Sequence, residues 1–103
     1  MTITDVLRQV SGKTTDRSGH VASYAVRSAG DVVAYVESRL DTASRTVANW
    51  RMQWTASWRD GSKIVSETST NLGQLLSRFK DVDLQPTAVI KPDEFFAQQP
   101  AKG

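Results

Sequence analysis

Apolar and polar residues alternate along the middle of the chain, most regularly between Thr46 and Arg59. A period of two places alternate residues on opposite faces of a β-strand. One face of this segment is therefore expected to be apolar, with Ala48, Trp50, Met52, Trp54, Ala56 and Trp58. Three neighbouring segments are also rich in β-branched and aromatic residues, and strands are predicted there as well: His20 to Arg27, Val32 to Leu40 and Lys63 to Thr68.

Short polar segments separate these strands and predict the turns of an antiparallel meander. They are Ala29-Gly30-Asp31, the segment 41–44 and Asp60-Gly61. Asp-Gly is the strongest of the three signals, because a two-residue hairpin turn favours residues that tolerate positive φ angles.

A helical interpretation competes with the strands, because apolar residues between Ala29 and Trp54 also recur at spacings of four and three. It takes two forms, a helix over Asp31 to Leu40 followed by strands, or one long helix. Thr42, Ser44, Thr46 and Asn49 are poor helix formers and favour the strands. We expect three or four strands and keep both helical forms as alternatives.

Helical spacing is clearer toward the two ends of the chain. Between Thr2 and Gly12 the apolar residues form one face, and Thr2 with Asp5 resembles a capping box. A second helix is predicted from Thr70, as its N-cap, to Lys80, with an apolar face that covers one side of the sheet: Leu72, Leu75, Leu76 and Phe79.

The C-terminal part is expected to be largely irregular. The chain should leave the second helix over 81–86, extend briefly over 88–90, and form a helical turn over 92–96 that starts at Pro92. Adjacent Phe95 and Phe96 either close the core together or leave one ring for a partner subunit. We thus predict a single α+β domain over residues 1–97 and a flexible tail over 98–103.

The amino-acid composition limits which catalytic and metal-binding sites are expected. The chain has 103 residues and no cysteine, and His20 is its one histidine. We therefore expect no disulfide, metal or cofactor. Gly12-Lys13-Thr14 lacks the first glycine of a phosphate-binding loop, and the nearby Asp16, Ser18 and His20 have no visible oxyanion hole, so no enzyme is expected. No apolar run is long enough for a bilayer or a secretory signal, which predicts a cytoplasmic protein.

The spacing of the tryptophans determines where a partner is expected to bind. If Trp50, Trp54 and Trp58 form the core beneath the second helix, the other sheet face is polar and mildly basic. The alternative is that the tryptophans are exposed and stack on bases. With the tryptophans buried, the candidate partner-binding residues are Arg27, Tyr35, Arg39, Asn49, Arg51, Gln53, Arg59 and Lys63.

A net charge of +2 gives only a weak electrostatic attraction for the phosphates of a nucleic acid. We therefore expect a small non-catalytic protein that presents its polar sheet face or a sheet edge to a protein partner and forms a homodimer. Inhibitor, adaptor and assembly subunit are all compatible with this. The alternative is a nucleic-acid-binding module that uses the sheet-face arginines and an aromatic stacking group. Neither a membrane nor a small-molecule substrate is expected.

Overall fold

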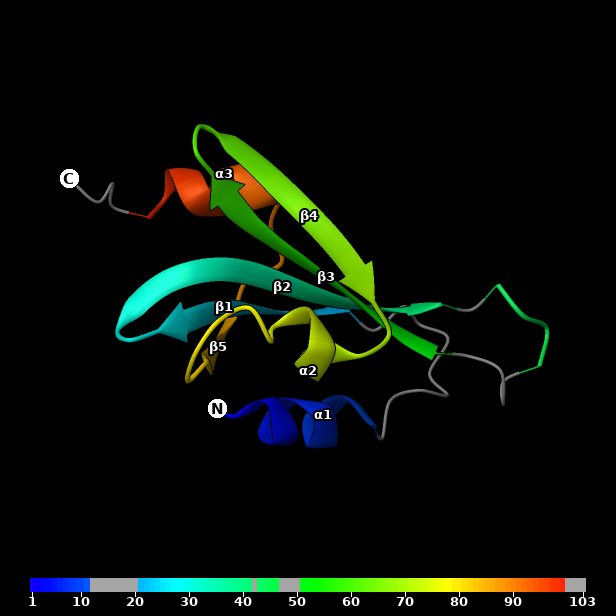
Figure 1. Cartoon of the computed structure of the whole chain (residues 1–103). Helices are drawn as coiled ribbons and strands as arrows, with labels where there is room; N and C mark the ends of the chain where they lie inside the picture. Colours follow the sequence, from blue (N-terminus) through cyan, green and yellow to red (C-terminus); the bar gives the residue numbers. More distant parts are fainter. Residues whose placement is uncertain (12–20, 42, 47–50, 100–103) are drawn as a thin grey trace.

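The protein folds around one antiparallel sheet of five strands in the order β4-β3-β2-β1-β5 (Figure 1). The computed structural model describes residues 1–11, 21–41, 43–46 and 51–99. In chain order, the elements are α1 (Ile3–Ser11), β1 (Val21–Ser28), β2 (Asp31–Asp41), β3 (Arg51–Asp60), β4 (Lys63–Ser69), α2 (Leu72–Leu75), β5 (Asp83–Thr87) and α3 (Pro92–Ala97). The predicted α+β class is confirmed.

Residues 31–41 form a strand, so both helical interpretations of this region are wrong. β2 pairs with β1 from Asp31 to Arg39 and with β3 from Tyr35 to Asp41. The β-branched residues at the start of β2 favour a strand, because their side chains pack well on a pleated surface. This preference outweighs the helical spacing of the apolar residues. Trp50 and Asn49 lie outside the described residues, and β3 is described from Arg51.

Two tight turns connect the hairpins. The β1–β2 turn consists of Ala29 and Gly30, both with positive φ, at 52° and 84°. The β3–β4 turn lies one residue later than expected, because Asp60 pairs with Lys63 and leaves Gly61 and Ser62 as the loop. Gly61 supplies the positive φ of 64° at the first loop position, where a residue without Cβ suits the hairpin twist.

The first helix begins with the expected capping box. The Thr2 amide donates to Asp5 Oδ2 at 3.0 Å, and the Asp5 amide donates to Thr2 Oγ1 at 3.1 Å. Hydrogen bonds from the Thr2 backbone and then from its side chain lower the pKa of Asp5 below its ordinary value.

The second helix is much shorter than predicted. It covers only Leu72–Leu75, and Asn71 rather than Thr70 is its N-cap. Gln74 O accepts from the Ser77 amide at 3.3 Å and from Ser77 Oγ at 2.7 Å, so a side chain competes for the carbonyl that would continue the helix. The expected apolar stripe is nevertheless buried or partly buried against the main core.

The fifth strand was not expected. β5 is a short edge strand that contains Pro86 and pairs with β1. Proline is tolerated there because an edge strand need not donate every backbone N–H. The N-terminus of the chain lies along the outer side of β5, where the Leu84 amide donates a hydrogen bond of 2.8 Å to Met1 O.

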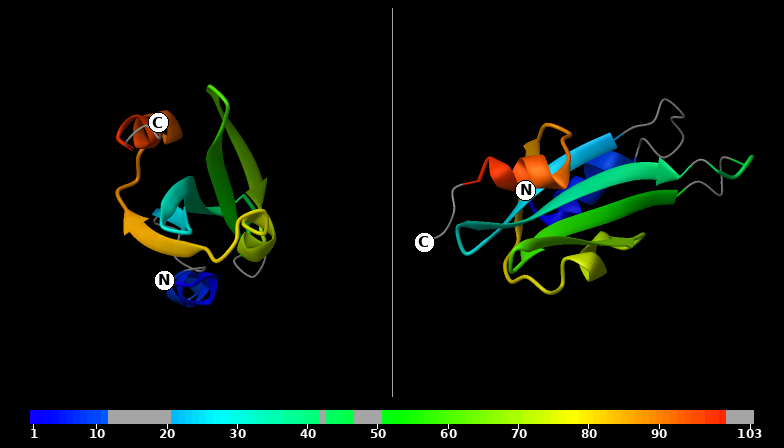
Figure 2. Two further views of the ribbon diagram at one scale, coloured as in Figure 1. Left: turned by 60° about the vertical axis from the view of Figure 1, so that its left-hand side comes forward. Right: turned by 90° about the horizontal axis from the view of Figure 1, so that it is seen from above.

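Helices cover both faces of the sheet, with α1 and α3 on opposite sides (Figure 2). The main core lies on the α1 and α2 side and includes Val6, Tyr24, Trp54 and Leu72. Trp54 is 1% exposed, so its expected burial is confirmed. Trp58 packs edge to face against Phe79 but is only partly buried.

A second, smaller cluster lies on the other face, beneath α3. It consists of Tyr35, Phe95 and Phe96, all at most 4% exposed. Both phenylalanines are thus core residues, with their rings nearly perpendicular at 87°. Because α3 covers the sheet at Tyr35, only part of the predicted polar face remains exposed.

Candidate protein-binding surfaces

The structure places five of the predicted partner-binding residues in two regions. The first, which we call the open face, is the uncovered part of the sheet surface on the α3 side. It consists of Glu37, Arg39, Asp41, Arg51, Gln53, Thr55 and Thr68. The second is a cleft at the other end of the sheet, to which Arg27 and Arg59 contribute.

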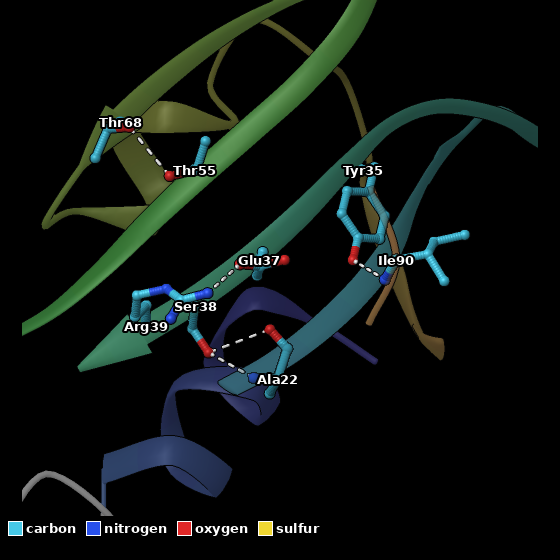
Figure 3. Close-up of polar contacts among 8 residues, drawn as sticks. All are labelled: Ala22, Tyr35, Glu37, Ser38, Arg39, Thr55, Thr68 and Ile90. Carbon is cyan, nitrogen blue, oxygen red and sulfur yellow. Dashed lines mark hydrogen bonds and ion pairs between the residues drawn. The ribbon is translucent and has the colours of Figure 1, made fainter. Parts of the chain in front are cut away.

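Cross-strand pairing assembles the open face from three strands. Arg39 lies opposite Gln53, Glu37 opposite Thr55, and Thr55 opposite Thr68. The Thr55 and Thr68 hydroxyl oxygens are 3.0 Å apart and share a hydrogen bond (Figure 3). Such side-chain pairs fix the polar groups relative to the rigid sheet.

The charges of the open face compensate one another. Arg39 Nη2 lies 3.4 Å from Glu37 Oε1, while the Arg39 side chain remains 70% exposed. Figure 3 marks this ion pair with a dashed line. Asp41 lies opposite Arg51 in the β2–β3 ladder and accepts a hydrogen bond of 3.4 Å from Gln53 Nε2. Two arginines thus face two carboxylates, and the surface is polar but close to neutral.

Tyr35 does not belong to the open face, which corrects the sequence-based prediction. Its side chain does point to the α3 side, but it is 1% exposed and its ring lies 4.8 Å from that of Phe95. The Tyr35 hydroxyl accepts a hydrogen bond of 3.2 Å from the Ile90 amide (Figure 3). The alternation pattern placed Tyr35 on the correct face, but it gave no information about a short helix that returns to cover that face.

The second region exists because the sheet splits between its two hairpins. Val26 pairs with Ala34 and Arg27 with Val32, so Val33 is an extra residue in β2, a β-bulge. The β2–β3 ladder starts just beyond it, at Tyr35 and Ser57. Bulges bend a strand and end its pairing. The turn ends of the two hairpins accordingly diverge in Figure 1.

A cleft of about 830 Å³ occupies this split, and we call it the hairpin cleft. Apolar side chains from several elements form much of its wall: Val32, Val33, Trp58, Phe79 and Phe96. Its polar lining includes Arg27, Asp31, Arg59 and Gln99.

Each arginine of the cleft is held by one backbone carbonyl. Arg27 Nη2 donates to Gly30 O, and Arg59 Nη2 donates to Phe96 O, both at 2.6 Å. The Arg59 guanidinium also lies 5.5 Å from the centroid of the Phe96 ring. Since a guanidinium has five N–H donors, these contacts orient the group without using all of its donors.

The remaining predicted residues do not join either cluster. Lys63 is exposed beside the β3–β4 turn, and Asn49 lies outside the described residues. Sequence reasoning missed Val33, Phe79 and Phe96 as cleft residues. The bulge that creates the cleft depends on the pairing of distant segments, and no local signal in the sequence marks it.

Within residues 1–11, 21–41, 43–46 and 51–99, no three side chains of metal-ligating type gather in one place. None of the helices described in these ranges is both long enough and apolar enough to span a bilayer. His20 lies outside them.

These features define an α+β domain with a split five-stranded antiparallel sheet. Comparison of the chain with protein-family models, curated proteins and solved structures finds no match.

Proposed function

We propose that this domain is a non-catalytic binding protein that presents its open face to a protein partner. The observation that carries the proposal is the compensation of charge across that face, where Arg39 pairs with Glu37 and Arg51 lies opposite Asp41. Polar groups that are fixed on a rigid sheet and balanced in charge suit a protein surface of complementary pattern.

The same observation weighs against nucleic acid. Affinity for a phosphate backbone comes from cations that displace counterions, and an arginine beside a carboxylate contributes less of that term. A single-strand platform also needs exposed aromatic rings. Tyr35, one of the aromatic residues predicted on the polar face, is buried beneath α3.

Self-association is the second part of the proposal, and it concerns the opposite edge of the sheet from β5. β4 is the terminal strand at that edge and is exposed over most of its length, including Ile64 at 38%. An outer strand with unpaired backbone groups favours antiparallel pairing with a second copy about a two-fold axis.

The open face is tested by site-specific photo-crosslinking in the source cells. A photoreactive residue at Gln53 is expected to give one discrete adduct, and the same residue at Gln85 on β5 is expected to give none. The captured protein is then purified and titrated with the domain. Arg39→Glu should weaken binding at least tenfold, whereas Lys80→Glu, an exposed cation outside both regions, should not. Equal effects of the two substitutions would rule out the open face.

Self-association is tested by sedimentation equilibrium of the purified protein. We expect a monomer–dimer equilibrium that Ile64→Lys shifts to monomer. Val89→Lys is the matched control, because Val89 is an exposed aliphatic residue, at 52%, outside every strand. A wild-type protein that remains monomeric at all concentrations would exclude the homodimer.

A further inference from the structure

The hairpin cleft combines two features that bear on ligand binding. It is lined by strand segments that lack one neighbour, and it contains two oriented guanidinium groups. Asp31 to Ala34 of β2 pair only with β1, apart from the bulged Val33, and Trp58 to Asp60 of β3 pair only with β4. Each segment therefore directs one strand edge toward the split.

Strand edges of this kind bind extended peptides. A segment in β conformation supplies the backbone N–H and C=O groups that the neighbouring strand lacks, and its alternate side chains enter the adjoining pockets. Near the two edges, the cleft offers apolar walls for such side chains, Trp58 and Phe79 on one side and Phe96 on the other.

The charges in the cleft select the chemistry of that segment. Arg27 and Arg59 line it, each fixed by a single carbonyl contact, with Asp31 as the carboxylate of the lining. A guanidinium with remaining donors forms its strongest hydrogen bonds with carboxylates. A ligand that alternates acidic and apolar side chains matches both the arginines and the aromatic walls.

From these observations we infer that the hairpin cleft binds an extended, acidic segment of a protein partner by strand addition. The inference rests on the proposed protein-binding function and adds a second contact site to it, distinct from the open face. The carboxylates of the segment pair with Arg27 and Arg59, and its apolar residues pack between the hairpins.

The test uses a blocked hexapeptide in which glutamate alternates with valine and phenylalanine, N-acetyl-Glu-Val-Glu-Phe-Glu-Val-amide. It is titrated into the ¹⁵N-labelled protein and followed by amide chemical shifts. We expect saturable shifts at Val32, Val33 and Arg59 and at the Trp58 indole. The peptide with lysine in place of glutamate should bind at least tenfold more weakly, because its charge is reversed. The glutamate peptide with alternate backbone amides methylated should also bind at least tenfold more weakly, because it loses N–H donors for strand pairing.

Variants of the protein complete the test. Arg27→Gln should weaken binding of the acidic peptide about tenfold, and the matched Arg8→Gln, at an exposed position of α1 outside both surfaces, should leave it unchanged. Because Arg59 also holds α3, Arg59→Lys is used beside Arg59→Gln, and the amide spectrum reports whether either variant remains folded. The lysine variant should retain more affinity than the glutamine variant.

Three results would overturn the inference: no saturable shift at millimolar peptide, equal binding of the lysine peptide, or shifts confined to the open face. The last of these results would be compatible with the proposed function and would rule out only the cleft as a peptide-binding site. Conversely, if a photoreactive residue at Gln53 gives no adduct while the peptide still shifts the cleft residues, the open face is ruled out as a binding surface and the cleft is supported.

Discussion

Arg59 and Phe96 connect the β3–β4 hairpin to the C-terminal helix. The Arg59 guanidinium donates a hydrogen bond of 2.6 Å to the Phe96 carbonyl and lies 5.5 Å from the centroid of the same ring. These contacts join residues that are 37 positions apart in the sequence. They hold α3 over Tyr35 and also orient one of the two arginines of the hairpin cleft.

Removal of this connection should destabilise the fold. Arg59→Ala loses a hydrogen bond from a charged donor and a cation–π contact, so we expect the free energy of unfolding to fall by about 1–3 kcal/mol. Urea unfolding measures the change. Arg39→Ala is the control, because its ion pair with Glu37 is exposed and such pairs contribute about 0–1 kcal/mol. Equal losses in the two variants would show that Arg59 does not hold α3.

A second prediction concerns the hydroxyl of Tyr35. Tyr35→Phe removes the acceptor for the Ile90 amide, and because an amide left without a partner loses a hydrogen bond, we expect a loss of about 1 kcal/mol in the free energy of unfolding. Tyr24→Phe is the matched control. The Tyr24 hydroxyl lies 3.5 Å from Gln9 Oε1, at the limit of a hydrogen bond, so its removal should change stability by less. Thermal unfolding of both variants at neutral pH makes the comparison.

The third prediction distinguishes two neighbouring candidates for a helix cap. Asn71 Oδ1 accepts from the Gln74 amide at 3.0 Å, so Asn71→Ala should reduce the free energy of unfolding by about 1 kcal/mol. Thr70→Ala should leave it nearly unchanged, although the sequence pattern favours Thr70 as the cap. Urea unfolding of the two variants separates these possibilities. A larger effect at Thr70 would contradict the observed start of α2.

This difference shows what sequence patterns can predict for this chain. β3 follows from alternation, because a strand with one buried face has a period of two. The other strands of the two hairpins follow from their β-branched and aromatic residues and from the turn residues between them. The capping box of α1 follows from Thr2 and Asp5, since it depends only on residues three positions apart. Local interactions of this kind can be recognised without knowledge of the remaining fold.

The features that the sequence did not predict depend on distant segments. β5 is a five-residue strand with a proline, and only its pairing with β1 makes it a strand. Tyr35 is buried because α3 returns over it from more than 50 residues further along the chain. The hairpin cleft results from the register of β2 against two neighbours. The candidate site was therefore predicted as one continuous face, whereas the structure divides it.

The last prediction concerns alkaline pH and the environment of Tyr24. Burial of this side chain in the main core raises its pKa above the ordinary value of 10.0, because the phenolate is less well solvated there than in the unfolded chain. The folded state thus binds the Tyr24 proton more tightly than the unfolded state does. The resulting stability is fully present below the unfolded pKa and is lost as pH rises through the higher folded pKa.

Tyr24→Phe removes this titration while preserving most of the buried ring. Wild type and variant should have similar free energies of unfolding at neutral pH, where Tyr24 is uncharged in both states. Above the ordinary tyrosine pKa of about 10, the wild-type free energy should decrease more steeply with pH than that of the variant. Urea unfolding at a series of alkaline pH values gives the two curves. Parallel curves would show that Tyr24 ionises in the folded protein as readily as in the unfolded chain, and would place its hydroxyl in contact with water.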